Sequence, residues 1–158
     1  MPGAGKSTVG PILARHTHRA FLDCDALLRQ RQGRDLQDIV DAQGHLALRA
    51  LEERLLLDIS EREHVIATGG SAVYSEKAMR HLKTLGQVVW LRLGLDELTR
   101  RIDNFGQRGL AKRPEQTLAD LYEERQPLYR RYADIVVDCD GITPEETVRA
   151  CLQALAMK

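Results

Sequence analysis

The sequence has no long apolar run, no net charge and few aromatic residues. No stretch approaches the roughly 18 apolar residues that a membrane-spanning helix needs, and no charged-then-apolar signal pattern opens the chain. Lys plus Arg number 23, as do Asp plus Glu, and the aromatic residues are one Trp, four Tyr and two Phe. So few rings on a neutral chain argue against nucleic-acid binding. We therefore expect a cytoplasmic protein without a membrane or nucleic-acid partner.

Cysteine is also scarce. Cys24, Cys139 and Cys151 have no metal-ligand spacing, and an odd number does not suit a disulfide framework. We expect all three to be buried as small hydrophobic side chains. A chain of 158 residues can bury a core without disulfides or a structural metal, and no repeat or linker divides it. One domain over residues 1–158 is therefore predicted, and we expect a monomer.

Short apolar runs alternate with segments of helical periodicity. Strand-like runs occur at residues 20–22, 64–67, 88–91 and 135–137. This alternation predicts an α/β fold, a parallel sheet with helices on both faces. Helices are expected at residues 6–15, 46–59, 75–85, 96–102, 118–132 and 143–156.

The chain opens on a glycine-rich run before the first helical segment. A phosphate-binding loop needs small residues so that backbone N–H groups can converge, a lysine for the outer phosphates and a hydroxyl for magnesium. Gly3, Gly5, Lys6 and Ser7 supply these features, although an ordinary helix start is the alternative for such a run taken alone. The residues expected to contact ATP here are Gly3, Ala4, Gly5, Lys6, Ser7 and Thr8.

Part of the phosphate-loop pattern is missing. The full motif GxxxxGK[ST] requires a glycine one position before Met1, and a buried strand should lead into it. That strand would lie in the middle of the sheet. We therefore expect Met1 to be an internal methionine or a trimmed start.

Two carboxylates follow the strand at residues 20–22. Asp23 and Asp25 are two residues apart, so both side chains can point to the same side, at the edge of the sheet where α/β proteins bind ligands. The alternative for Asp25 is a cap for the helix beginning near Ala26.

Three further segments carry candidate ligand-binding residues. Arg49 and Glu52 lie three apart on one predicted helix, where the glutamate can orient the guanidinium or form a solvated ion pair with it. Gly69 and Gly70 follow a strand, either to let a ligand approach the backbone or as a plain turn. Arg125 precedes an apolar patch late in the chain.

Residues 103–116 contain two glycines and a proline, with basic residues and little apolar periodicity. This composition predicts a mobile surface loop, and we interpret it as a lid over the site.

In this order and at these separations, the segments resemble the shikimate kinase family, small P-loop kinases with a five-stranded parallel sheet. The resemblance covers essentially the whole chain and leaves only the first strand without a counterpart. It implies ATP and Mg²⁺ as cofactors. It also implies transfer of the γ-phosphoryl group to a hydroxyl of shikimate, giving shikimate 3-phosphate in aromatic amino acid biosynthesis.

The resemblance assigns the acceptor side of the site. Asp25, Arg49 and Arg125 match the residues around shikimate, and Gly69 and Gly70 match the first two glycines of a triple-glycine turn. The two arginines would grip the carboxylate through paired hydrogen bonds. Asp25 would accept a hydrogen bond from the attacking hydroxyl.

The resemblance also assigns the nucleotide side of the site. Ser7 would bind magnesium directly and Asp23 would hold it through water, while Lys6 would hold the β and γ phosphates. Arg108 would close over the γ phosphate when the lid shuts. Arg101 matches a lid arginine near adenine, and residues 137–144, ending at Pro144, resemble the adenine loop.

Three positions depart from the family pattern. Ser71 replaces the third glycine of the turn, Gly109 replaces the proline of the lid segment RPLL, and His45 stands where glutamate is usual. They leave three alternatives open: a related hydroxy acid as acceptor, a kinase for gluconate or a nucleotide monophosphate, and a nucleotide-binding module without catalysis.

Overall fold

The computed structural model describes residues 1–102 and 109–157. Its strands form two parallel pairs. β1 (Ala20–Asp23) pairs with β2 (His64–Ala67), and β3 (Val89–Arg92) pairs with β4 (Ile135–Asp138). The predicted strands are therefore all present, each within one residue of its expected bounds.

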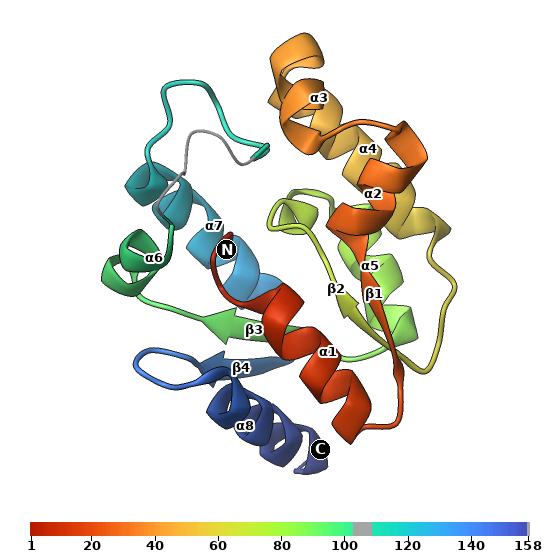
Figure 1. The fold of residues 1–158 in the computed structure, drawn as a ribbon, viewed down its shortest axis with the longest axis vertical. Helices are drawn as coiled ribbons and strands as arrows, with labels where there is room; N and C mark the ends of the chain where they lie inside the picture. Colours follow the sequence, from red (N-terminus) through yellow and green to blue (C-terminus); the bar gives the residue numbers. More distant parts are fainter. Residues whose placement is uncertain (103–108, 158) are drawn as a thin grey trace.

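The two strand pairs do not join into one sheet within the described residues. Figure 1 shows the pairs set apart, with α1 (Lys6–His16) in front of the space between them. A cavity of about 320 Å³ lies there, lined by β2, by Val89 of β3 and by apolar side chains that include Leu13, Met79, Leu82 and Leu155.

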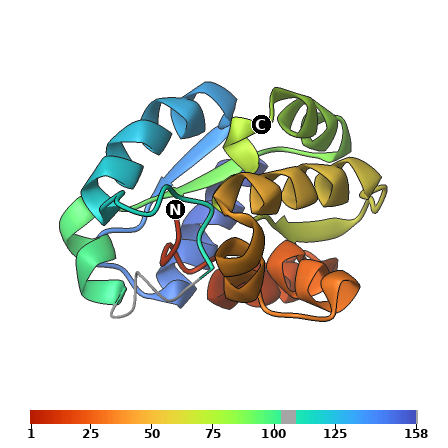
Figure 2. The same ribbon diagram turned by 90° about the horizontal axis from the view of Figure 1, so that it is seen from above.

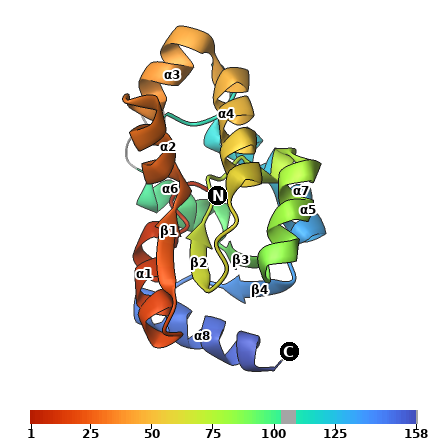
Figure 3. The same cartoon turned by 90° about the vertical axis from the view of Figure 1, so that its right-hand side faces the viewer.

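Helices cover both faces of the strands. Figures 2 and 3 show α1 and α8 on one face and α5 and α7 on the other, while α2, α3 and α4 project beyond one end of β1 and β2. α1 packs on β1 and β2, and α8 packs on β4. Apart from α1, the helical elements are α2 (Cys24–Gln32), α3 (Leu36–Gln43), α4 (His45–Asp58), η1 (Ala72–Tyr74), α5 (Glu76–Leu85), α6 (Leu95–Arg101), α7 (Leu118–Tyr132) and α8 (Pro144–Ala156).

The helix ends follow local chemistry. α7 and α8 each begin with a capping box, in which Thr117 pairs with Asp120 and Thr143 pairs with Glu146. Pro144 occupies the first turn of α8, where its missing N–H costs no hydrogen bond. The six predicted helices are confirmed to within one residue at each end. α3 was not predicted, and α2 entered only as the helix expected near Ala26 in the alternative for Asp25.

The three cysteines are buried, as predicted. Burial raises the pKa of the Cys24 thiol to about 12 and that of Cys151 to about 11, which keeps both thiols protonated and unreactive. Among the described residues, no helix combines the length and the apolar character needed to cross a bilayer.

Candidate active site

The phosphate loop has the backbone of an anion site. Gly3 and Gly5 have φ of +74° and +86°, in the left-handed region that favours glycine. α1 begins at Lys6 without a side-chain cap, and the amides of Gly5, Lys6 and Ser7 donate to no acceptor in the described part of the chain. These free N–H groups at the positive end of α1 can bind phosphate oxygens.

Lys6 folds back over this loop. Its ammonium donates a hydrogen bond of 3.0 Å to the Met1 carbonyl. Burial lowers the pKa of Lys6, and the charge of Asp25 opposes that shift. The ammonium therefore lies close to both the loop and the Asp25 carboxylate, as a lysine that holds outer phosphates must.

Asp23 connects the loop to the end of β1. The Ser7 hydroxyl donates to Asp23 Oδ2 at 2.9 Å, while Asp23 Oδ1 accepts from the amides of Asp25 at 3.0 Å and Ala26 at 3.1 Å. Asp23 therefore caps α2. The alternative of Asp25 as the cap is wrong, because its carboxylate turns into the interior instead.

The Ser7 and Asp23 oxygens fit a magnesium ion. Mg²⁺ prefers hard oxygen ligands and takes one or two protein groups beside substrate phosphates and water. Residues 1–102 and 109–157 contain no cluster of three or more His, Cys, Asp or Glu side chains that could enclose a metal. This open pair is the type of site that a nucleotide-bound magnesium uses.

Gly69 provides room for two carboxylates. A Cβ on Gly69 would lie 2.2 Å from Glu52 Oε1 and 3.1 Å from Asp25 Oδ1. Burial raises the pKa of Asp25. The positive charge of Lys6 opposes this shift, and the negative charge of Asp23 adds to it. Gly70 has the same function beside Arg125, whose Nη1 would lie 2.8 Å from an added Cβ. Charged side chains thus approach the backbone closely at both strand-end glycines, which a plain turn would not need.

Glu52 does not orient Arg49. Both expectations for the pair are wrong, because Glu52 is only 9% exposed and turns toward Gly69, while the ion-pair partner of Arg49 is Glu124. Burial, followed by the Asp25 charge, raises the pKa of Glu52 to about 8. Glu52 Oε2 is buried with no hydrogen-bond partner in the described chain.

The two predicted clamp arginines come together. Arg49 Nη2 and Arg125 Nη2 each donate to the carbonyl oxygen of Ala111, both at 3.1 Å. Arg125 is 1% exposed, while the side chain of Arg49 is 21% exposed. Two guanidiniums that converge on one oxygen form a binding site for a planar anion such as a carboxylate.

Two site residues were not identified from the sequence. The Tyr74 ring lies 3.6 Å below the Arg49 guanidinium carbon, and its hydroxyl donates to Glu124. Tyr74 comes from η1 and Glu124 from α7, 50 positions later. A tyrosine in a short turn and a glutamate on a charged helix carry no local signal of this contact.

The residues predicted to border adenine lie at the ends of two helices. Arg101 ends α6, where Glu97 pairs with it at 2.6 Å. Burial raises the pKa of Cys139, which lies in the predicted adenine loop. Pro144 starts α8 at the end of that loop. Arg108 lies outside the described residues.

Comparisons with known proteins identify the family. A family model described as shikimate kinase matches residues 2–156. The shikimate kinase of Pseudomonas paraeruginosa is 37% identical over 156 residues, which cover 97% of this chain and 91% of that protein. The chain belongs to the shikimate kinase family.

Solved structures agree with this assignment. A shikimate kinase from Acinetobacter baumannii in complex with shikimate superposes with a TM-score of 0.89 and 32% identity, covering 98% of this chain and 88% of that one. Shikimate kinase from Aquifex aeolicus superposes with a TM-score of 0.84 and 33% identity, covering 99% and 92%. The predicted family, P-loop kinase fold and enzyme class, an ATP-dependent kinase, are confirmed.

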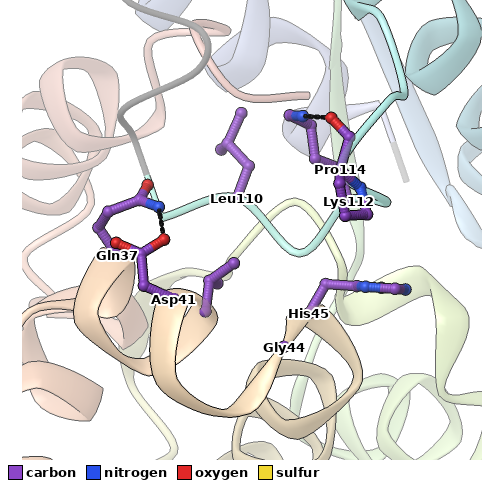
Figure 4. Close-up of a pocket in the computed structure, with 8 residues that line it drawn as sticks. Gln37, Asp41, Gly44, His45, Leu110, Lys112 and Pro114 are labelled. Atoms are coloured by element: carbon purple, nitrogen blue, oxygen red, sulfur yellow. Dashed lines mark hydrogen bonds between the residues drawn. The ribbon is translucent and has the colours of Figure 1, made fainter.

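One departure from the shikimate kinase pattern, His45, lines a cavity, and a second, Gly109, contacts the lining residue Gln37. Figure 4 shows this space between α3, the start of α4 and the described part of the lid segment. The Gly109 amide donates to Gln37 Oε1 at 2.6 Å. A Cβ added to Gly109 would lie 2.5 Å from the backbone nitrogen of Gln37. The cavity measures about 360 Å³ and is lined by Gln37, Val40, Asp41, Gly44, His45, Leu110, Lys112 and Pro114.

The third departure has a simple structural account. Ser71 has φ of −91° and ψ of −3°, a turn conformation with negative φ that does not need glycine. It is buried, and its carbonyl accepts the Tyr74 amide at 3.0 Å. Serine is therefore compatible with the shikimate kinase turn.

Proposed function

We propose that this chain transfers the γ-phosphoryl group of ATP to a hydroxyl of shikimate. The observation that carries the proposal is the convergence of Arg49 and Arg125 on one oxygen. A pair of guanidiniums selects an acceptor with a carboxylate, which gluconate and shikimate have and a simple alcohol lacks. Membership of the shikimate kinase family favours shikimate between these two acids.

The nucleotide side positions the phosphates. The free amides of Gly5, Lys6 and Ser7, with the Lys6 ammonium, would hold the β and γ phosphates. Ser7 and Asp23 would hold Mg²⁺, which neutralises phosphate charge when bound. Ala4 and Thr8 complete the loop, and Arg101 and the stretch ending at Pro144 are proposed to border adenine.

Asp25 is proposed to orient the attacking hydroxyl. Its carboxylate is close to the Lys6 ammonium, so an oxygen bound there lies next to the phosphate end of the loop. Its raised pKa, caused first by burial, makes it a better proton acceptor than an exposed aspartate. Arg108, from the lid segment, is proposed to stabilise the transferred phosphoryl group.

The experiment measures ADP release from Mg-ATP with and without shikimate, with gluconate and AMP in parallel. We expect stimulation by shikimate that is lost in Asp25→Asn and kept in the control Asp38→Asn, which alters an exposed aspartate on α3. Stimulation by gluconate or AMP alone would identify a different acceptor. ATP binding without stimulation by any acceptor would indicate a non-catalytic nucleotide-binding module.

A cytoplasmic location and a monomeric state complete the proposal. Gel filtration with light scattering tests the second, since a molecular mass near 17.8 kDa is expected.

A further inference from the structure

Tyr74 lies between the two arginines of the proposed acceptor site. The Arg49 guanidinium carbon is 3.6 Å from the centre of its ring, and that of Arg125 is 5.2 Å away. The negative face of an aromatic ring attracts a guanidinium and favours parallel stacking. The ring therefore fixes the plane in which the N–H groups of Arg49 point.

The Tyr74 hydroxyl fixes the second arginine. It accepts a hydrogen bond from Arg125 Nε at 3.2 Å and donates one to the Glu124 carboxylate. With Nε engaged, Arg125 Nη2 points at the Ala111 oxygen. One side chain thus contacts one guanidinium through its ring and the other through its oxygen.

Glu124, on α7, is held in place by two side chains of the lid segment. Its Oε2 accepts from Gln116 Nε2 at 2.7 Å and from Arg113 Nη2 at 3.2 Å, and its Oε1 lies 3.8 Å from Arg49 Nη2. The Tyr74 hydroxyl, more than any other contact, lowers the pKa of Glu124 and keeps it ionised. This negative charge offsets the repulsion between two guanidiniums held close together.

We propose that Tyr74 is a positioning residue that aims Arg49 and Arg125 at the carboxylate of the acceptor and so determines carboxylate specificity. The inference rests on the proposed function, because it assumes that the acid replaces Ala111 as the shared acceptor. Tyr74 is half-buried, with its ring against a cation and its hydroxyl between two charged groups. Packing alone would not require this arrangement.

The test compares Tyr74→Phe and Tyr74→Leu with the wild-type chain. Calorimetry gives the Kd of shikimate and of its methyl ester, and ADP release gives KM for shikimate and for Mg-ATP. The phenylalanine variant keeps the stack and loses the two hydrogen bonds of the hydroxyl, of which one is to a clamp arginine, so its Kd for shikimate should rise about 2- to 5-fold. The leucine variant loses the stack as well as the hydrogen bonds, and its Kd for shikimate should rise about 10- to 30-fold.

The methyl ester separates aiming from general damage. An ester lacks the negative charge that two guanidiniums grip, so its weak binding should change by less than about 2-fold in either variant. The KM for Mg-ATP should also stay unchanged. The control is Tyr122→Leu, which trims a half-buried tyrosine of α7 that packs on the core; it should leave both Kd values unchanged. Thermal denaturation checks that each variant is folded.

The outcomes separate the two proposals. An active wild-type enzyme whose Kd for shikimate is unchanged in both variants overturns the role of Tyr74 alone. Equal losses for shikimate and its ester overturn it as well, because they indicate a structural role. A wild-type chain that neither binds nor phosphorylates shikimate overturns the proposed function, and the role of Tyr74 with it.

Discussion

The Ser7 hydroxyl donates a hydrogen bond of 2.9 Å to the Asp23 carboxylate, which caps α2 with its other oxygen. The second residue of α1 is thus tied to the residue that ends β1. Asp23 has two separable functions, a structural one through Oδ1 and a proposed metal-binding one through Oδ2.

Asp23→Asn tests the metal-binding function, since asparagine caps a helix about as well as aspartate but carries no charge. We expect the Mg²⁺ concentration for half-maximal ADP release to rise about 10-fold or more, as when an outer-shell ligand is lost. The control Asp35→Asn changes the residue before α3, whose side chain makes no cap hydrogen bond. An unchanged Mg²⁺ requirement in Asp23→Asn would contradict the assignment.

The arginine clamp predicts a selective loss of acceptor binding. In Arg49→Lys or Arg125→Lys the charge stays, but the paired hydrogen bonds are lost. The KM for shikimate should rise about 10- to 100-fold, equivalent to one lost charged hydrogen bond, and the KM for ATP should not. Arg54→Lys, on an exposed position of α4, is the control. Equal increases in both KM values would refute the assignment.

A side chain at Gly69 should displace Glu52, because an added Cβ would lie 2.2 Å from Glu52 Oε1 and 3.1 Å from Glu52 Cδ. We expect Gly69→Ala to lower the free energy of unfolding by about 1–3 kcal/mol, as overpacking does, and to weaken shikimate binding. Gly86→Ala is the matched control, since nothing lies within 4 Å of a Cβ there and φ is 176°. Denaturant unfolding of the two variants gives the comparison. A stable Gly69→Ala protein would show that Glu52 is free to move away.

The buried carboxyl group of Glu52 should make the free energy of unfolding depend on pH. Its pKa is about 8 in the folded chain, raised first by burial, against 4.5 as its ordinary value. Between these values the folded chain keeps a proton that the unfolded chain releases, so stability falls as pH rises through this window. The total change is on the order of a few kcal/mol.

Glu52→Gln should remove that dependence. Glutamine stays neutral in both states, so the variant should gain stability over wild type as pH increases from 5 to about 8. Urea unfolding at several pH values measures the difference. Glu53→Gln, the neighbouring position on α4, should follow the wild-type curve. Parallel curves for wild type and Glu52→Gln would mean that Glu52 is ionised in the fold.

The sequence predicts the regular elements well and the side-chain directions less well. The predicted bounds of α7 are those observed, because a capping box starts a long amphipathic pattern. α3 was missed since its eight residues bury only Leu36 and Ile39, too few for a clear period.

In the site, too, the positions that local sequence specifies were predicted, and the side-chain directions that depend on tertiary packing were not. Ser7 and Asp23 could be placed from a motif and a strand end, which local sequence encodes. The direction of Glu52 depends on the space beside Gly69, a tertiary property that three-residue spacing does not specify. Tyr74 meets Glu124 only after η1 and α7 pack together, so no local pattern could reveal it.

The position of the phosphate loop has a consequence for unfolding. Pro2 lies 3.5 Å from a Cβ on Gly70, in the turn after β2, while Gly3 approaches Ile102, just beyond α6, which follows β3. The loop thus contacts the turn that follows β2 and the segment that follows α6. A nucleotide bound to the loop amides should hold the two pairs together, so adding Mg-ATP should slow hydrogen exchange in all four strands at once. Without nucleotide, the connection between the pairs rests on α1, which packs on β1 and β2 and also on α8, the helix that covers β4.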